Sequence, residues 1–167
     1  MPQADFSISI IGPESDAVLR NLFEFYVHDM AAWFDLDTRP DGSYSYDTTP
    51  IWEKSYDVYL ARTGDSPAGF AIIGPADEWL GGAGAHDVHE FFVIRRHRRH
   101  GLGRTMANYL WNHNPGEWLV RALEENAPAV VFWRSAIASY SGGSYAEEGC
   151  TSKGRAWRFF RFTSAAC

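Results

Sequence analysis

The chain has 167 residues, of which 46% are hydrophobic and 16% aromatic, enough to form one core in a single domain over residues 1–167. Its formal net charge of −6 and its pI of about 5.4 argue against a nucleic-acid-binding protein, because a pI above about 9 is usual for such domains. No apolar run approaches the roughly 20 residues that span a bilayer, no basic start precedes an apolar N-terminal run, and two cysteines are too few for a disulfide framework. We therefore expect a cytoplasmic protein with neither a nucleic-acid nor a membrane partner.

The N-terminal part of the sequence predicts a strand, a helix and a long loop. Apolar and β-branched residues alternate over residues 6–11 and predict a strand. A helical pattern of apolar residues follows from residue 15 to about residue 33. Polar and turn-forming residues over 38–50 predict a loop.

Two apolar runs in the middle of the sequence predict a β-hairpin. The runs cover residues 58–61 and 69–73, and the turn-forming pair Gly64-Asp65 lies between them. Residues 81–84, which include three glycines, predict a flexible connector to the next strand.

The most informative segment covers residues 93–104, where an apolar strand leads through a basic, glycine-bearing turn into a helix. The first N–H groups of a helix lack intrahelical partners, and the helix dipole adds partial positive charge there. Gly101 and Gly103 let an anion approach the main chain without a Cβ in the way. The segment contains no acid and five arginines, namely Arg95, Arg96, Arg98, Arg99 and Arg104. It therefore predicts a site for a phosphate or pyrophosphate.

The spacing of this turn excludes two common nucleotide motifs. A dinucleotide fingerprint needs a third glycine where Met106 stands, and a nucleoside-triphosphate loop needs a Gly-Lys-Ser/Thr sequence that is absent. The phosphate ligand is therefore of another class.

The C-terminal part of the sequence predicts a strand over 118–122 and then a helix. Asn126 is a suitable N-cap for this helix, and Pro128 falls in its tolerant first turn. Residues 141–144, Ser-Gly-Gly-Ser, predict a turn. No Gly-x-Ser-x-Gly elbow is present, which argues against a hydrolase of that type.

The turn from Arg98 through Gly101 to Gly103 resembles the Arg/Gln-x-x-Gly-x-Gly/Ala turn of the GCN5-related N-acetyltransferase (GNAT) superfamily. The strand before the turn, the helix after it, and Asn126 followed by the aromatic pair Phe132-Trp133 also fit the layout of that superfamily. Features of a little-characterised bacterial branch are recognised in residues 26–29, 41–46 and 132–134, and in Tyr140 followed by Gly142 and Gly143.

This resemblance implies an α/β fold of the α+β type. It consists of a mixed, mostly antiparallel sheet, splayed in the middle, with helices on both faces and acetyl-CoA as co-substrate in the splay. The main-chain N–H near Val93 would polarise the thioester carbonyl, a donor worth on the order of 3 kcal/mol in acyl transfer. The implied cofactor-binding residues are Val93, Ile94, Arg98, Arg99, His100, Gly101, Leu102, Gly103, Arg104 and Asn126.

Carboxylates on the strand before the turn are the candidate general bases. We expect Glu90 to act first and Asp87 second, through water, because a carboxylate is a weak base toward an ammonium group. Strand alternation puts Asp87 and His89 on one face and Glu90 on the other, unless a bulge changes the register. Alternatively, Glu90 pairs with a neighbouring arginine, and His86 and His89 bond to the backbone. These two histidines point to opposite faces of a strand, so no metal site is expected.

The proton donor to the leaving thiolate is less clearly marked. Many members of the superfamily have a tyrosine seven residues after the asparagine, where this chain has Trp133, and an indole N–H is not a useful acid. Tyr140, two helical turns further along, or Tyr145 could take the place of the missing tyrosine. The third alternative is that no acid is used. The pattern favours a half-buried core aromatic over a proton donor at Tyr140.

The resemblance places the amine-binding pocket on the first helix and the loop after it. Acids there would attract a cationic amine, or they serve as turn formers and solubilising groups of the loop. These acids are Asp29, Asp35, Asp37, Asp41, Asp47, Glu53 and Asp57, against Arg39 and Lys54. The nearby aromatics form either a cation-binding wall or ordinary packing, and they are Trp33, Phe34, Tyr44, Tyr46 and Trp52.

The resemblance therefore predicts an N-acetyltransferase that moves the acetyl group of acetyl-CoA to a small primary amine by direct attack. The alternative is a catalytically silent, acyl-CoA-binding sensor or partner module, which Trp133 in place of tyrosine keeps open. The sequence leaves the oligomeric state open, with a homodimer as one possibility.

Overall fold

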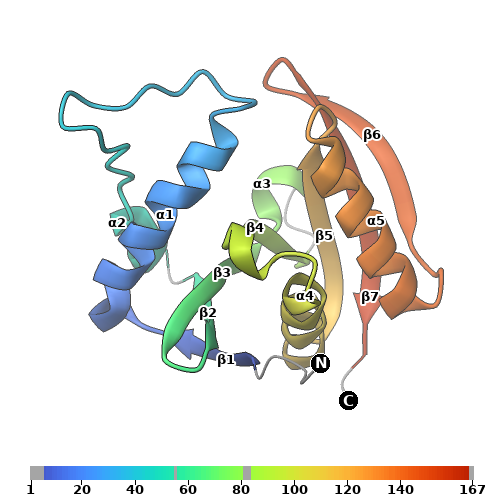
Figure 1. Ribbon diagram of the computed structural model, residues 1–167. Helices are drawn as coiled ribbons and strands as arrows, with labels where there is room; N and C mark the ends of the chain where they lie inside the picture. Colours follow the sequence, from blue (N-terminus) through green and yellow to red (C-terminus); the bar gives the residue numbers. More distant parts are fainter. Residues whose placement is uncertain (1–5, 55, 81–83, 166–167) are drawn as a thin grey trace. The chain divides into compact units, whose positions relative to one another are not determined.

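The computed structural model describes residues 6–54, 56–80 and 84–165 (Figure 1). Each predicted strand and helix is present, and the predicted glycine connector falls partly on residues 81–83, outside the described residues. In chain order the elements are β1 (Phe6–Ile11), η1 (Pro13–Ser15), α1 (Asp16–Met30), α2 (Thr49–Glu53), β2 (Asp57–Thr63), β3 (Ser66–Pro75), α3 (Asp77–Leu80), β4 (His86–Val93), η2 (Arg95–His97), α4 (Leu102–His113), β5 (Gly116–Leu123), α5 (Ala127–Ser141), β6 (Ala146–Ser152) and β7 (Arg155–Ser164).

The strands form one sheet in the order β1-β2-β3-β4-β5-β7-β6. The pairs β1–β2, β5–β7 and β6–β7 are antiparallel. β2 and β3 are joined by the predicted two-residue turn at Gly64-Asp65. β4 and β5 are parallel, with His86 opposite Trp118 and Asp87 opposite Leu119. The prediction of a mixed, mostly antiparallel sheet is thus confirmed.

The chain forms two compact units, which are described separately below. Unit 1 comprises Met1–Ile72 and Glu90–Gly103, and unit 2 comprises Ile73–His89 and Arg104–Cys167. The chain passes from one unit to the other within β3, within β4 and in the first turn of α4.

The core of unit 1 forms where the apolar face of α1 packs on the sheet. α1 buries Leu19, Leu22, Phe23 and Val27, which recur at helical spacing. Their partners in the sheet are Val58, Leu60, Phe70, Ile72 and Phe92. Burying a side chain of this size contributes about 1.5–3 kcal/mol, so this stripe is the main reason why α1 is a helix.

Two details of unit 1 differ from the sequence prediction. α1 ends at Met30 rather than near residue 33, because the amides of Trp33 and Phe34 both bond to the Met30 carbonyl and close the helix in a turn. The short helix α2 begins at Thr49, inside the predicted loop, with Pro50 in its first turn. Five residues are too few to give a helical period in the sequence.

In unit 2, α5 packs on β5 and β7 (Figure 1). Asn126 caps α5 as predicted, since its Oδ1 accepts a hydrogen bond of 3.2 Å from the Ala129 amide. Gly142 ends the helix in the left-handed conformation, with φ of 61°. Trp111, Trp118 and Phe160 are fully buried large side chains of this core.

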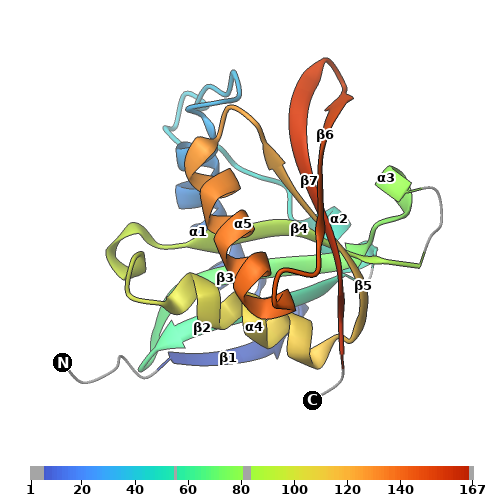
Figure 2. The same ribbon diagram turned by 90° about the vertical axis from the view of Figure 1, so that its right-hand side faces the viewer.

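A long hairpin of β6 and β7 completes unit 2 (Figure 2). Every residue of β6 pairs with one of β7, from Ala146–Arg161 to Ser152–Arg155. Neither β6 nor β7 was predicted, because no strand was expected after the turn at residues 141–144. β6 has little strand character of its own, since most of its residues are polar and it contains Gly149. Pairing with β7, which buries Phe159, Phe160 and Phe162, holds β6 in the sheet.

β4 contains one residue more than the part of β3 beside it. The Ile94 amide bonds to the Ala68 carbonyl at 2.9 Å, and the Ala76 amide bonds to the Ala85 carbonyl at 2.8 Å. Between these two bonds β3 advances by eight residues and β4 by nine, which indicates a β-bulge in β4.

Candidate active site

The predicted anion site is a turn of residues 98–101 between η2 and α4. Two of its residues have left-handed backbones, Arg99 with φ of 62° and Gly101 with φ of 88°. No atom lies within 4 Å of a Cβ built on Gly101, so this glycine is required by its backbone conformation and not by lack of space.

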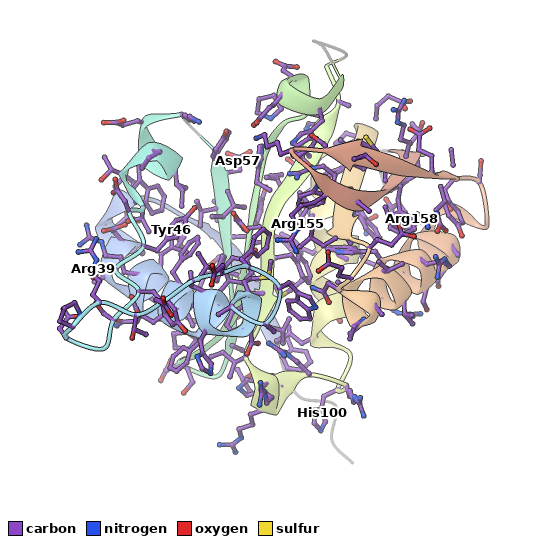
Figure 3. All side chains as sticks on the ribbon, turned by 90° about the horizontal axis from the view of Figure 1, so that it is seen from above. Arg39, Tyr46, Asp57, His100, Arg155 and Arg158 are labelled. Carbon is purple, nitrogen blue, oxygen red and sulfur yellow. The ribbon has the colours of Figure 1, made fainter. Side chains whose placement is uncertain are left out.

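The turn presents main-chain donors and exposed cations together. Arg99, His100 and Gly101 are exposed, and the His100 side chain projects away from the turn (Figure 3). The predicted helix begins at Leu102, so its first four N–H groups have no partner within the helix. Leu102 itself is fully buried, and only its main chain can face a ligand. The turn has the features of an anion site at a helix N-terminus.

The Arg98 side chain points into unit 1. Its Nε donates to the Val93 carbonyl oxygen at 2.7 Å, its Nη2 donates to the Asp29 carboxylate, and its guanidinium lies 5.5 Å from the centre of the Phe92 ring. Arg95 also reaches Asp29, at 3.2 Å. Arg98 is among the cofactor-binding residues that the resemblance implies, and its guanidinium is engaged by protein groups.

The main chain at the end of β4 has one amide committed to the sheet. The Ile94 N–H bonds to the carbonyl of Ala68 in β3. The Phe92 carbonyl oxygen lies against Gly69 of β3. Because the C=O and N–H of one trans peptide point in opposite directions, the Val93 N–H is directed away from β3. Gly69 lies close to this part of β4, since a Cβ on it would clash with the Phe92 carbonyl oxygen and come within 3.2 Å of the Val93 Cα.

Glu90 lies in unit 1 beside the aromatic residues of α1. The Tyr26 hydroxyl donates a hydrogen bond to its Oε2. The Tyr26 ring makes edge contacts with Phe23, Phe70 and Phe92, at centroid distances of 5.7, 5.7 and 5.9 Å. The carboxylate is half-buried and its hydrogen-bonding tyrosine is fixed by ring packing.

Tyr46 reaches the same region from the loop after α1. Its ring stacks on Phe23 at 4.3 Å (Figure 3). Burial raises the pKa of Tyr46, and the negative charges of Glu90 and Asp47 raise it further. Tyr46 therefore stays a neutral hydroxyl near Glu90 at ordinary pH.

Asp87 lies in unit 2 and has a different environment. It is fully buried, and its two oxygens accept hydrogen bonds of 3.0 and 2.6 Å from Arg121. The Arg121 guanidinium lies 4.3 Å from the ring centre of Trp79 and 5.8 Å from that of Trp157. A carboxylate held this way is part of a buried ion pair, whose loss would leave an uncompensated charge.

The two histidines of β4 bond to the backbone, as one of the sequence alternatives held. His86 Nε2 lies 3.4 Å from the Pro115 carbonyl oxygen. His89 has a backbone hydrogen bond with Pro75, and its Nδ1 lies 3.5 Å from Asp87. Burial lowers the pKa of His89, although the charge of Asp87 acts in the opposite direction. Among residues 6–54, 56–80 and 84–165, no group of His, Cys, Asp and Glu is placed to hold a metal ion.

The β4 bulge limits the alternation argument of the sequence analysis. Asp87 and His89 contact one another, as residues two apart on one face do. The extra residue lies between Ala85 and Ile94, so strict alternation does not extend along the whole strand. A separation of three residues therefore does not by itself place Asp87 and Glu90 on opposite faces of β4.

Tyr140 and Trp133 lie on α5 in unit 2. The Tyr140 hydroxyl donates to Asn112 Oδ1 at 2.8 Å, and its ring packs 4.9 Å from that of Trp111. Trp133 is buried, with 6% of its surface exposed. Arg104, at the start of α4, donates to Ser135 Oγ of α5 at 2.8 Å.

Three of the seven acids named for the expected amine pocket have structural partners. Asp29 binds Arg95 and Arg98, Asp41 accepts from the amide and hydroxyl of Ser43, and Asp47 accepts from the Thr49 amide. Glu24 of α1 accepts from the amides of Tyr44 and Ser45. Trp52 donates to Asp16 at 2.7 Å, which makes it a structural aromatic.

The sequence analysis missed three partners of the site residues. These are Tyr26 beside Glu90, Arg121 beside Asp87, and Asp29 beside Arg98, which are 64, 34 and 69 positions from their partners. Tyr26 and Asp29 fall in a segment that carries the family resemblance, but no local sequence pattern predicts which residues they contact. Nothing in the sequence around Arg121 marks it.

A family model described as the acetyltransferase (GNAT) family matches residues 23–136. No curated protein sequence matches the chain. In the described residues, no helix combines the length and apolarity needed to cross a membrane.

Many solved structures have a similar fold. The Salmonella typhimurium protein yncA, solved with its cofactor acetyl-CoA, is 16% identical with a TM-score of 0.64, over 97% of this chain and 99% of that one. The ribosomal-protein-S18-alanine N-acetyltransferase of Escherichia coli is 14% identical with a TM-score of 0.64, over 98% and 96% of the two chains. The spermidine N-acetyltransferase of Vibrio cholerae, solved with CoA and spermine, is 11% identical with a TM-score of 0.64, over 95% of each chain.

These structural likenesses, at identities of 11 to 16%, show a common fold. The family match covers the region from α1 to α5, including β4, the anion turn and α4. With the mixed sheet and the turn at the start of α4, it shows that the chain belongs to the acetyltransferase (GNAT) family.

Proposed function

We propose that this protein is an N-acetyltransferase that moves the acetyl group of acetyl-CoA to a primary amine by direct attack. The observation that carries the proposal is the continuous stretch from Glu90 to Leu102. It bears a half-buried carboxylate, a strand amide directed away from β3, and an anion turn at a helix N-terminus. Acetyl-CoA, when bound, supplies an activated thioester.

The turn and its neighbours are the proposed acetyl-CoA site. The amides of the turn and of the first turn of α4 hold the pyrophosphate, and the Val93 N–H donates to the thioester carbonyl oxygen. The left-handed Gly101 fits this role, because its main chain faces an anion without a side chain. Leu102 contributes through its main chain, because its side chain is fully buried. The proposed residues are Val93, Ile94, Arg98, Arg99, His100, Gly101, Leu102, Gly103, Arg104 and Asn126.

Glu90 is the proposed general base. Its hydrogen bond from Tyr26 fixes the orientation of the carboxylate, which accepts a proton from the amine through water in this proposal. Asp87, the second candidate, is fully buried and held by two bonds from Arg121. We therefore assign Asp87 to the buried ion pair and the proton transfer to Glu90.

The CoA thiolate is proposed to leave with solvent help or with a proton from Tyr140. The Tyr140 hydroxyl donates to Asn112, so its proton has a defined direction before any substrate binds. A thiol is acidic enough for its thiolate to leave without a strong acid, and the buried Trp133 therefore does not oppose turnover.

A small primary amine is the proposed acceptor. Glu90 is a negative charge at the aromatic residues Tyr26, Tyr46 and Phe92, a surrounding that favours a cationic head group. Two similar structures are named as N-acetyltransferases of spermidine and of an alanine of ribosomal protein S18, and spermidine presents primary amines.

The alternative proposal is a silent acyl-CoA-binding module that acts as a sensor or partner. It is favoured by one feature, the buried Trp133 where many family members have a tyrosine. Thiol release from acetyl-CoA, measured across a panel of small amines with CoA affinity measured in parallel, separates the two. Amine-dependent release supports the enzyme, binding without release for any amine supports the sensor, and absence of CoA binding contradicts both.

The substitution Glu90→Gln tests the assignment of the base. It keeps the shape of the side chain and a partner for Tyr26 but removes the base, so we expect turnover to fall about 100-fold while CoA affinity stays the same. Steady-state kinetics and calorimetry measure the two quantities. Unchanged turnover would move the proton transfer to bulk water or another group.

A further inference from the structure

We propose that Asp29 is a positioning residue for acetyl-CoA binding, which acts by holding Arg98 and thereby the start of the anion turn. In this assignment the Arg98 side chain ties the turn to β4 and α1 and is not a ligand of the pyrophosphate. The inference rests on the proposed function, since it concerns the same site.

Three contacts fix the Arg98 guanidinium within unit 1. Nε donates to the Val93 carbonyl oxygen, Nη2 donates to Asp29, and the flat group lies over the Phe92 ring. A guanidinium is a planar fork, so two bonded nitrogens fix the direction of its remaining donors. The positive charge is also balanced by the carboxylate of Asp29.

Asp29 is well placed for this role. It lies in the last turn of α1, and its side chain is 21% exposed. The second cation that reaches it, Arg95, has a side chain that is 81% exposed, so that ion pair contributes little. Arg98 is therefore the main partner of Asp29.

The turn needs an anchor because its own backbone bonds end early. The Ile94–His97 and Arg95–Arg98 backbone hydrogen bonds, of 2.8 and 3.2 Å, close η2. Beyond them Arg99 and Gly101 have left-handed backbones, which a regular ladder does not hold in place. The Arg98 side chain is what connects this segment to β4 and to α1.

The two possible roles of Arg98 predict opposite effects of Asp29→Asn. If Arg98 binds the pyrophosphate, removing the carboxylate frees the guanidinium and removes a negative charge, so CoA should bind more tightly. If Arg98 is a structural tie, the same substitution loosens the turn, so CoA should bind more weakly. The sign of the change in affinity therefore decides between them.

We expect the dissociation constant for CoA to rise about tenfold in Asp29→Asn, the effect of losing one charge-assisted hydrogen bond. Asp29→Glu should restore part of the affinity because it keeps the charge. Asp65→Asn, which removes the same charge from the β2–β3 turn, should match the wild type. In the background of Arg98→Met, Asp29→Asn should add little further loss, because the two residues act as one unit.

Kinetics separates positioning from general damage to the fold. We expect Asp29→Asn to raise the KM for acetyl-CoA while kcat at saturating acetyl-CoA stays near the wild-type value, and circular dichroism verifies the fold. If Asp29→Asn fails to fold, Asp29→Glu and Arg98→Lys provide the same comparison. Unchanged or tighter CoA binding in these variants overturns the role of Asp29, whereas a wild-type protein that binds no CoA overturns the proposed function itself.

Discussion

Glu90 and Asp87 are three residues apart on β4, and their surroundings give them different chemistry. Asp87 is fully buried against Arg121, whereas Glu90 is half-buried and accepts a hydrogen bond from the neutral hydroxyl of Tyr26. Removing either partner of a buried ion pair costs about 3–5 kcal/mol, so replacing Asp87 would destabilise unit 2. A hydrogen bond from a neutral hydroxyl costs less to rearrange, which is why we propose Glu90 and not Asp87 for the proton transfer.

The partner of Glu90 can be tested by removing one oxygen atom. Tyr26→Phe keeps the ring contacts with Phe23, Phe70 and Phe92 but removes the donor to the carboxylate. We expect kcat/KM to fall about tenfold, the usual effect of losing one oriented hydrogen bond, and the acidic limb of its pH profile to move to higher pH.

The control for this substitution is Tyr44→Phe. It removes a tyrosine hydroxyl that lies 3.2 Å from His28 Nδ1 on the same side of unit 1. Its pH profile should match that of the wild type. A Tyr26→Phe enzyme with wild-type kcat/KM would show that Glu90 does not depend on this bond.

At the scale of the element, β4 is shaped by its close approach to β3. Gly69 of β3 leaves room for the Phe92 carbonyl oxygen, a backbone group that cannot move aside as a flexible side chain can. The amide assigned to the thioester carbonyl belongs to the next residue, Val93. The geometry of the proposed site therefore depends on a glycine in the neighbouring strand.

Gly69→Ala should push β4 away from β3. We expect a loss of about 1–3 kcal/mol in the free energy of unfolding, the usual cost of forcing an extra carbon into a packed site, together with weaker acetyl-CoA binding. Gly149→Ala is a suitable control, since Gly149 also lies in a strand and a Cβ on it meets no atom within 4 Å. Chemical denaturation and calorimetry measure the two effects, and equal stability of the two variants would contradict this account.

Sequence patterns were sufficient for most elements and insufficient for their pairings. The amphipathic α1, the Asn126 cap and the Gly64-Asp65 turn depend on local residues and were predicted. β6 and β7 were both missed, and β6 has residues that do not favour a strand and is held in the sheet by pairing with β7. The partners of Glu90, Asp87 and Arg98 are brought together by tertiary packing, which leaves no local pattern.

At the scale of the whole molecule, His89 couples stability to pH. Its folded-state pKa lies below the ordinary value of 6.5, because burial disfavours the charged ring. The unfolded chain therefore binds more protons between the folded pKa and 6.5, and the free energy of unfolding falls as the pH drops through that window. The charged and polar groups around it are Asp87, Arg121, Glu78 and the backbone of Pro75.

We therefore expect the melting temperature to decrease below pH 6.5, at a pH still too high for the carboxylates to become protonated. The carboxylates with lowered pKa values, such as Asp16, Glu78 and Glu147, lose their stabilising effect only at lower pH, below about 4.5. Thermal unfolding between pH 7 and pH 5 should show a smaller slope in His89→Gln than in the wild type. His113→Gln, at an exposed histidine, should keep the wild-type slope.

At Arg99, which has a left-handed backbone, the residue best for stability differs from the residue best for binding an anion. A residue with a Cβ is disfavoured at φ of 62° by about 1 kcal/mol relative to glycine, so heat stability alone favours glycine there. Binding of an anion favours the positive charge that glycine would remove. In a library randomised at position 99, selection for resistance to heat should therefore enrich glycine or asparagine. Selection for binding to immobilised CoA should retain arginine.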